Sequence, residues 1–295
     1  MAGIIPVAGP DLNFNFPWHD SLQPIGRDYL AVERSVVECA TAGCNAIWVV
    51  CHDDMQPLIR YRLGEAAHDP GPLNAPKVKF LRMYKRTVPI YYVPVPVKER
   101  KSKDSFVWSI IRGAKTAEYI SKSISKWTIP TKYFVSFPYG LYASHYTGVG
   151  QERRPIHSQK NHFFSYNGRT ALDNEFLGLT LGMDDIDEAI FRIKKALTGG
   201  VFRDETSPFD ENLSIPEEMS PGLKTHKYGP LSMGFAFAHL KDKLSDSNIR
   251  EVPWFFDIST WEGYREYHAS EYDMKRPIEF ILKYREMVPL FREDL

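Results

Sequence analysis

The chain has 295 residues, of which 43% are hydrophobic and 25% are charged, as is usual for a globular protein with a large core. Its 37 basic and 37 acidic residues give a formal net charge of zero, which argues against general nucleic-acid binding, because that needs a basic surface. No window approaches the ~20 apolar residues of a membrane span, and the first residues do not resemble a signal peptide, so we expect a cytoplasmic protein.

The chain begins with a pattern of strand, loop, helix and strand. Residues 4–7 are apolar and end at an Ala-Gly-Pro turn. Residues 29–42 have helical periodicity, Gly43 ends that helix, and residues 47–51 form a continuous apolar strand typical of a parallel sheet. Together they predict a right-handed βαβ unit, whose ligand would lie beyond the first strand, at the long loop of residues 11–27.

The three cysteines all fall in or directly after this unit, at Cys39, Cys44 and Cys51. An odd number of cysteines, clustered on buried elements, favours free thiols over a disulfide framework. A disulfide between Cys39 and Cys44 is the alternative.

A polar triplet, His52-Asp53-Asp54, follows the second strand. Its members have the chemistry of metal ligands, but a carboxylate here can also cap a short helix over residues 57–63, which Gly64 would end. We favour the capping role.

Alternating strands and helices are expected in the middle of the chain. Residues 78–84 are either a strand or a short helix. Residues 89–95 predict a strand whose prolines suggest a sheet edge or an early end. A helix over 105–125, for which Asp104 is a suitable N-cap, and a strand over 133–137 follow.

The second half of the chain predicts a hairpin and several helices. Residues 163–169 enter an Asn-Gly turn, a strong hairpin signal, with a return strand within 175–182. Helices are expected over residues 184–197, capped by Asp184 or Asp185, over 234–244, and over 277–291, where an apolar face would pack on the core or on another subunit.

The first unit resembles the start of the sugar nucleotidyltransferases, which make nucleotide sugars from a nucleoside triphosphate and a sugar phosphate. The similar pieces are Val7-Ala8-Gly9, the Pro24-Ile25 segment and the Ala42-Gly43 helix end, in the order and spacing of that family. A phosphate can approach the backbone closely at a glycine such as Gly9, because it has no Cβ.

A second similarity lies near the end of the chain, where an aromatic strand is followed by Asp257-Ile258-Ser259-Thr260. The resemblance implies that Asp257 binds Mg²⁺, since this ion takes oxygen ligands. Equally, Asp257 can end the strand while Ser259 or Thr260 caps the next helix.

Three features depart from the family pattern. The Gly-Thr-Arg that follows the first turn is absent, Asp20 falls where the family has its catalytic lysine, and Tyr139 stands where a second aspartate holds Mg²⁺. These departures argue against unaltered pyrophosphorylase chemistry, which depends on positioning and charge neutralisation.

The resemblance implies an α/β fold of three layers with a mostly parallel central sheet, as in nucleotide-diphosphosugar transferases. We expect one domain over residues 1–295, with an irregular or antiparallel insertion at about 144–182 and a long loop at about 201–227.

The implied reaction is nucleotidyl transfer from a nucleoside triphosphate to a sugar phosphate, with release of pyrophosphate and with Mg²⁺ as cofactor. The candidate catalytic residues are His19 and Asp20, and Asp257 is the candidate metal ligand. The candidate nucleotide-binding residues are Ala8, Gly9, Pro10, Gln23, Asp104 and Ser105.

Two alternatives remain open at this stage. A relative that kept the fold and lost the chemistry would be a structural or regulatory binding protein. A glycosyltransferase would use a nucleotide sugar, but the one Asp-x-Asp, Asp185 to Asp187, falls at a helix start rather than a strand end. A homo-oligomer is compatible with all three.

Overall fold

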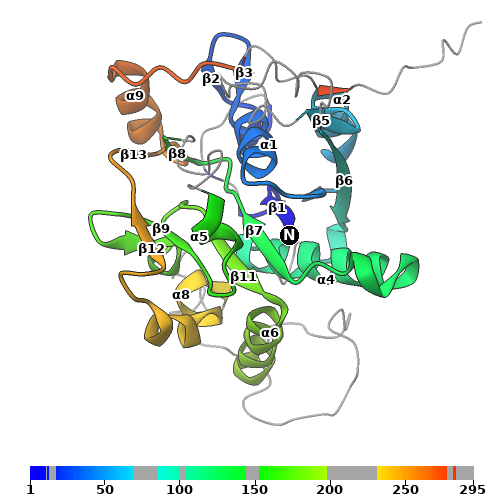
Figure 1. Ribbon diagram of the computed structural model, residues 1–295. Coiled ribbons are helices and arrows are strands. Elements are labelled where there is room, and N and C mark those ends of the chain that lie inside the picture. The colour runs from blue at the N-terminus through cyan, green and yellow to red at the C-terminus, as the bar shows by residue number, and fades with distance from the viewer. Residues whose placement is uncertain are drawn as a thin grey trace, which may run out of the picture.

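The computed structural model describes residues 1–10, 12, 18–68, 86–99, 104–143, 153–197, 231–277 and 282–283. It is a mixed α/β structure built around one large sheet (Figure 1). The expected segments at 78–84 and 201–227 lie outside the described residues.

Four parallel strands form the centre of the sheet, in the order β7 (Lys132–Val135), β1 (Ala2–Pro6), β4 (Ile47–His52) and β6 (Thr87–Val95). The pairing of β1 with β4 confirms the predicted βαβ unit, whose helix is α1 (Ala31–Thr41). As predicted, Gly43 follows this helix with a positive φ of 88°.

Antiparallel strands extend the sheet on both sides. Beyond β7 lie β11 (Leu179–Gly182), β9 (Phe163–Tyr166) and β10 (Arg169–Thr170), whereas β12 (Ile249–Glu251) pairs with β9 in parallel. Beyond β6 lie β5 (Ala66–His68) and β14 (Leu282–Lys283). Two small ribbons pair β2 (Pro24–Gly26) with β3 (Tyr29–Leu30) and β8 (Gly140–Tyr142) with β13 (Phe255–Asp257). The expected three-layer fold with a mostly parallel centre is confirmed.

Helices cover both faces of this sheet. One face carries α4 (Phe106–Ile124), α6 (Met183–Leu197) and α8 (Met233–Ala236), and the other carries α1. The remaining helices are α2 (Gln56–Leu63), α5 (Arg153–His157) and α9 (Trp261–Ala269). Short 3₁₀ turns occur at η1 (Asp20–Leu22), η3 (Lys126–Thr128), η6 (Ala171–Asp173) and η8 (Ala238–Lys243).

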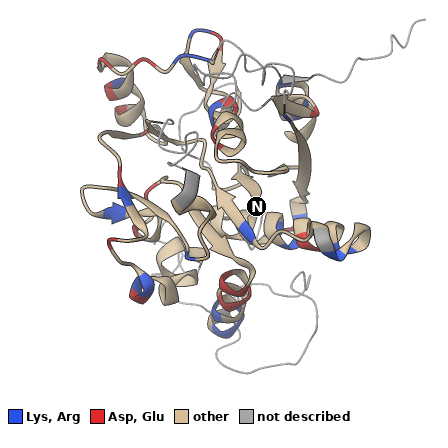
Figure 2. Cartoon of the chain, viewed as in Figure 1, with Lys and Arg blue, Asp and Glu red and all other residues tan. Residues whose placement is uncertain are grey.

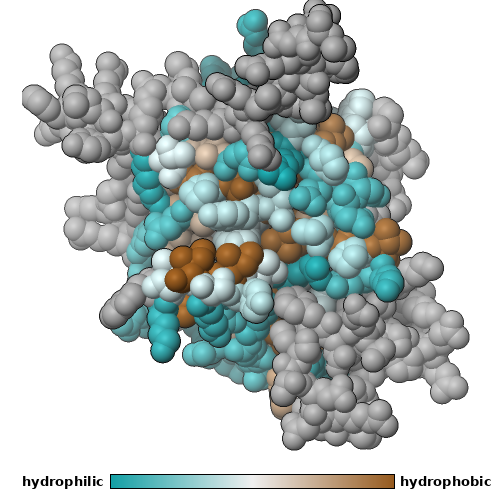
Figure 3. Space-filling model, turned by 90° about the vertical axis from the view of Figure 1, so that its right-hand side faces the viewer, coloured by the Kyte–Doolittle hydropathy of each residue, from teal (hydrophilic) through white to brown (hydrophobic). Residues whose placement is uncertain are grey.

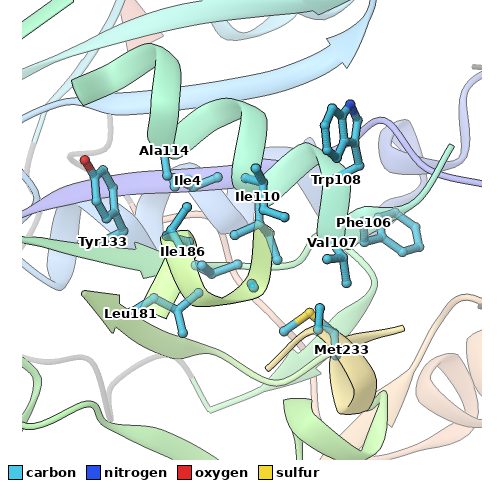
Figure 4. Packing of buried hydrophobic residues seen from close by; sticks show 14 of the residues in the cluster. Ile4, Phe106, Val107, Trp108, Ile110, Ala114, Tyr133, Leu181, Ile186 and Met233 are labelled. Carbon is cyan, nitrogen blue, oxygen red and sulfur yellow. The ribbon is translucent and has the colours of Figure 1, made fainter. Parts of the chain in front are cut away.

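Alternate residues of β1 supply the two cores. Ile4 packs under α4 with Ile110 and Ala114 (Figure 4), whereas its neighbour Ile5 faces the α1 side. Gly113 lets α4 approach closely, because a Cβ there would lie 2.9 Å from a methyl group of Val50. The central strands are therefore buried on both faces, as their continuous apolar sequences predict.

Charged residues lie mainly outside this centre. Figure 2 shows both signs on the surrounding helices and few charges on the central strands. Helix α6 has acidic residues in its first turn and basic residues in its last, as predicted, and this arrangement complements the helix dipole. Figure 3 shows hydrophilic and hydrophobic side chains mixed over the face on the right of Figure 1.

Several predicted caps are corrected by the structure. Helix α2 begins after Met55 without a side-chain cap, so neither Asp53 nor Asp54 caps it. Ser105, not Asp104, caps α4 by accepting a hydrogen bond from the Trp108 backbone.

Other boundaries differ because tertiary pairing overrides local pattern. Strand β6 runs through its prolines to Val95, so the predicted early end is wrong. Its residues 87–89 pair with β5 and its residues 90–95 pair with β4, so among the described strands the half that contains Pro94 is paired on one side only, as the predicted sheet edge requires. The predicted helix over 234–244 divides into α8 and η8. The described part of the predicted final helix, Leu282–Lys283, is instead a strand paired with β5.

The hairpin after β9 is present, with Asn167 and Gly168 both at positive φ. Its return strand is β10, directly after the turn, whereas the segment predicted for that role supplies β11. Helix α6 starts at Met183, and Asp185 accepts a hydrogen bond from the Gly182 backbone.

Candidate functional site

The turn after β1 lies at the carboxyl edge of the parallel strands. The backbone N–H groups of Val7 and Ala8 both donate to the carbonyl of Val50 in the neighbouring strand, at 2.8 Å. The Ala8 carbonyl accepts a hydrogen bond from the Ser109 hydroxyl of α4 at 2.7 Å. Strand and helix thus hold this turn where a ligand of an open α/β sheet is expected.

Gly9 has a packing partner that the sequence did not predict. A Cβ at this position would lie 2.5 Å from the ring of Phe106 in α4. The close approach that requires glycine here is therefore made by an aromatic ring of the same chain. Pro10 follows and is partly exposed.

The segment of residues 19–23 forms the short helical turn η1. His19 precedes it as the N-cap, and its Nδ1 accepts from the Ser21 backbone at 3.2 Å and lies 2.9 Å from the Ser21 hydroxyl. Asp20 is the first residue of the turn. Gln23 is fully buried, its carbonyl accepts from Ala31 at the start of α1, and its amide has no hydrogen-bond partner within the described residues.

The second candidate segment begins α4. Asp104 accepts from His52 at the end of β4, with 3.1 Å between its Oδ1 and the imidazole Nε2. The next residue, Ser105, uses its hydroxyl to cap α4. The sequence did not predict the pairing of His52 with Asp104, because the two residues come from elements far apart in the chain.

A buried aromatic cluster occupies the end of β7. The ring of Tyr139 packs 5.5 Å from the rings of both Phe106 and Phe176, and Phe137 packs 5.6 Å from Phe176. Tyr139 is only 2% exposed. Its phenol also reaches the Val7 carbonyl, at 3.5 Å. The position where the resemblance implies an aspartate is therefore filled by a packed ring.

A small hollow opens beside this cluster. It is lined mainly by apolar side chains, together with Asn174 and Glu175. The apolar lining residues are Phe106, Val107, Phe137, Phe176, Leu231 and Met233.

Asp257 ends β13 beside the turn after β7. It pairs in register with Gly140, and the next backbone N–H, of Ile258, donates to the Tyr139 carbonyl at 2.8 Å. Its Oδ1 accepts from the Ser259 backbone at 2.8 Å, while Thr260 caps α9. The strand-end and capping geometry that the sequence allowed is thus present, and the role of Asp257 as a metal ligand stays a prediction.

The described residues do not fit the two-carboxylate magnesium site of the resemblance. Asp257 supplies one carboxylate, and the neighbouring position is the packed phenol of Tyr139. Within the described ranges, no three His, Cys, Asp or Glu side chains are grouped so that they could hold a metal ion. The Asp-x-Asp at Asp185 lies in the first turn of α6, not at a strand end.

Helix α9 connects Asp257 to the segment that carries His19 and Asp20. The Tyr264 hydroxyl donates to the Pro24 carbonyl at 2.8 Å, and the Tyr267 hydroxyl donates to the Ile25 carbonyl at 2.6 Å. Residues more than two hundred positions apart in the chain thereby come into contact. No local pattern in the sequence signals these contacts.

A buried network of charged side chains on α1 contacts the segment that follows β7. Arg34 and Glu38 of α1 pair at 3.2 Å with their side chains at most 1% exposed, and Arg34 donates to the Gly140 carbonyl at 2.7 Å. Glu38 also accepts from Ser136 and Tyr142. In the sequence, this network is signalled by three charged residues, Glu33, Arg34 and Glu38, in a helix otherwise rich in small and apolar residues.

Electrostatics in this network follow from burial. Burial raises the pKa of Tyr142 well above its ordinary value, and the nearby Glu38 carboxylate adds to the effect. Burial opposes the charge of Arg34, but Glu38 keeps its pKa above the ordinary value. The guanidinium also lies over the Tyr142 ring, 4.2 Å from its centroid. Arg34 therefore stays charged and holds the turn that contains Tyr139.

All three cysteines are free and buried, which confirms the expectation of thiols. The sulfur atoms of Cys39 and Cys44 both lie beside Gly3, 2.8 and 3.3 Å from the position that a Cβ on this residue would take. Among the described residues, no helix is long and apolar enough to cross a membrane.

Comparison with solved structures identifies the fold. A glucose-1-phosphate thymidylyltransferase described from Bacillus anthracis matches at a TM-score of 0.51 and 10% identity, over 94% of this chain and 97% of that one. Two lower matches, both at a TM-score of 0.47, are a UDP-glucose pyrophosphorylase and a nucleoside-diphosphate-sugar pyrophosphorylase from Vibrio cholerae. Their identities are 14% and 11%, and both cover 91% of this chain, with 97% and 100% of their own lengths.

Sequence comparisons add no relative: no family model and no curated protein matches the chain. The structural neighbours are sugar nucleotidyltransferases at low identity, as the sequence resemblance predicted. At 10% identity, the first match shows the fold alone, and the activity has to be inferred from the residues of the site.

Proposed function

We propose that this chain binds a nucleoside triphosphate at the carboxyl edge of its parallel strands and transfers the nucleotidyl group to a sugar phosphate, releasing pyrophosphate. The observation that carries the proposal is the contact of α9 with Pro24 and Ile25. It joins the helix that follows Asp257 to the residues that follow His19 and Asp20 in the chain.

The chemistry depends on which groups meet the phosphates. His19 and Asp20 are the proposed catalytic residues, and the Ala8-Gly9-Pro10 turn, Gln23, Asp104 and Ser105 are the proposed nucleotide contacts. Transfer of a nucleotidyl group requires positioning and charge stabilisation more than covalent participation by the protein. Each lost electrostatic contact costs about 10²–10³ in rate, so we expect slow turnover from a site without the family's lysine and second aspartate.

A second candidate is a protein that binds nucleotide without turnover. It is favoured by the packed ring of Tyr139 and by the ring of Phe106 against Gly9, both of which take space that phosphates would need. Such a protein would respond to ligand but would not release pyrophosphate.

The experiment combines binding and turnover. Thermal unfolding is measured with each common nucleoside triphosphate, sugar phosphates and nucleotide sugars, with and without Mg²⁺. A ligand at 100 times its Kd adds about 2.7 kcal/mol to the free energy of unfolding. Pyrophosphate release is then measured with a mixture of sugar 1-phosphates.

The outcomes separate the candidates. Stabilisation together with pyrophosphate release supports transfer, and Asp257→Ala should then reduce the Mg²⁺-dependent rate, with Asp273→Ala as an exposed acidic control. Stabilisation without release supports binding alone. A protein that no nucleotide stabilises would refute both.

A further inference from the structure

An aromatic band extends from the start of β13 to the segment that follows α9. The indole ring of Trp254 stacks on the ring of Tyr272, with 4.7 Å between their centroids and 23° between their planes. Phe256 of β13 packs 6.0 Å from Tyr272 and 5.7 Å from Tyr267 of α9. Strand β13 lies beside α9 (Figure 1), so rings from consecutive segments form one packed cluster.

This aromatic band is fixed at one end and exposed at the other. Tyr267 is only 2% exposed, and its hydroxyl accepts from the Met274 backbone at 3.0 Å. The Tyr272 backbone donates to the Ser270 hydroxyl at 3.2 Å, yet the Tyr272 ring is 37% exposed, next to the partly exposed Trp254. Large rings held in fixed positions lose little conformational entropy on binding, and they are enriched in protein interfaces. The exposed end of the band therefore has the properties of an interaction surface.

The stretch that carries the band is locally acidic, although the whole chain has a formal net charge of zero. Tyr272 itself lies between Glu271 and Asp273, and Figure 2 shows acidic residues on α9 and on the segment after it. Arg276, which follows, is already paired with Asp28 at 2.9 Å. Within residues 251–275, the exposed basic residues are Arg265 and Lys275, whereas the exposed acidic residues are Glu251, Glu262, Glu266, Glu271 and Asp273. A ligand of this surface should consequently carry positive charge.

Rings and carboxylates together favour one kind of cation. An aromatic face attracts a positive charge that lies within about 6 Å of the ring centroid. The guanidinium group of arginine is planar, stacks on such faces and binds a carboxylate through two parallel hydrogen bonds, whereas the lysine ammonium is a strongly hydrated point charge. A protein segment that contains arginine therefore fits this surface better than a lysine-rich or an uncharged segment.

We propose that the surface formed by Trp254, Tyr272, Glu271 and Asp273 docks a basic, arginine-containing segment of a partner protein. Stacking on the exposed ring and pairing with the two carboxylates that flank it supply the affinity. None of these four residues belongs to the proposed catalytic, metal or nucleotide contacts, so docking is tested independently of nucleotide binding.

The probe is a short synthetic peptide of alternating arginine and glycine, whose binding to the full chain is measured by fluorescence polarisation. Tyr272→Ala should raise Kd about three- to thirtyfold, which corresponds to the loss of one cation–π contact. Glu271→Gln/Asp273→Asn should also raise Kd, and the same peptide with lysine for arginine should bind at least about threefold more weakly. Tyr119→Ala is the control that should leave Kd unchanged, because Tyr119 is 75% exposed and follows the acidic Glu118 but lies on α4.

Four results would overturn the proposal. The wild type could show no saturable binding of the arginine peptide, or it could bind the lysine peptide equally well, which would assign the attraction to charge alone. An unchanged Kd in a folded Tyr272→Ala protein would place the peptide elsewhere on the molecule. A dimer in sedimentation that Tyr272→Ala dissociates would make a second copy of this chain the occupant. The first two results use only the wild type, so they decide the proposal even if a variant fails to fold.

Discussion

Removal of Glu38 tests whether the buried network holds the edge of the site. This carboxylate accepts from Ser136 at 2.5 Å and from Tyr142, and it pairs with Arg34 at 3.2 Å. Glu38→Ala would leave the charge of Arg34 buried and two hydroxyl groups without their acceptor. Breaking a buried ion pair in this way costs about 3–5 kcal/mol.

The control is an ion pair with the same spacing on the surface. Glu188 and Arg192 of α6 also lie four residues apart and pair at 2.9 Å, but both side chains are more than a third exposed. Glu188→Ala should cost no more than about 0.5 kcal/mol, because solvent screens such pairs.

The double variant Arg34→Met/Glu38→Leu distinguishes the interaction between Arg34 and Glu38 from the contacts that each residue makes with other groups. It removes both charges, so it should cost less than the sum of the single variants Arg34→Met and Glu38→Leu by more than about 1 kcal/mol. Some cost remains, because Arg34 also donates to the carbonyls of Phe137 and Gly140. Urea unfolding followed by fluorescence and circular dichroism measures the wild type and each of these variants.

Two results would refute this reasoning. A cost below about 1 kcal/mol for Glu38→Ala would mean that the carboxylate is not a buried anion in the folded protein. Strict additivity of the two single variants would mean that Arg34 and Glu38 do not interact.

Three further predictions concern packing, pH and capping. Gly9→Ala should destabilise the protein by about 1–3 kcal/mol in urea unfolding, because its Cβ meets Phe106 at 2.5 Å, and Phe106→Leu in the same chain should recover part of the loss. Burial lowers the pKa of His162 to about 4, so between pH 6.5 and 4 the unfolded chain binds a proton that the folded chain does not. The free energy of unfolding should therefore fall by up to about 3 kcal/mol as the pH drops through that range, and His162→Phe should flatten this part of the pH profile. Thr260→Ala should cost about 1 kcal/mol of thermal or urea stability, because its hydroxyl caps α9 through the Gly263 backbone at 3.2 Å, whereas Thr260→Ser should not.

The sequence by itself determined the elements whose pattern is local. Apolar runs in β1 and β4 and the helical period of α1 predicted the parallel βαβ unit, because a strand buried on both faces needs apolar residues throughout. Asn167-Gly168 predicted the hairpin, since both residues tolerate positive φ. Order and spacing of the first unit also predicted the fold seen in the structural neighbours.

Tertiary structure alone decided how distant residues meet. Strand β14 forms where a helical pattern was expected, because the edge of β5 offers backbone partners that periodicity does not record. Which side chain caps a helix depends on the backbone direction at the start of the helix, and so the Ser105 hydroxyl caps α4 while Asp104 pairs with His52.

The candidate site shows most clearly which features follow from local sequence and which depend on contacts between distant residues. The sequence named Gly9 as a place of close approach but could not say that Phe106 makes the approach, because the ring comes from a helix nearly a hundred residues later. It likewise gave no sign that Tyr267 donates to Ile25. Such contacts are fixed by the stacking of helices on the sheet, a property of the whole fold rather than of any segment.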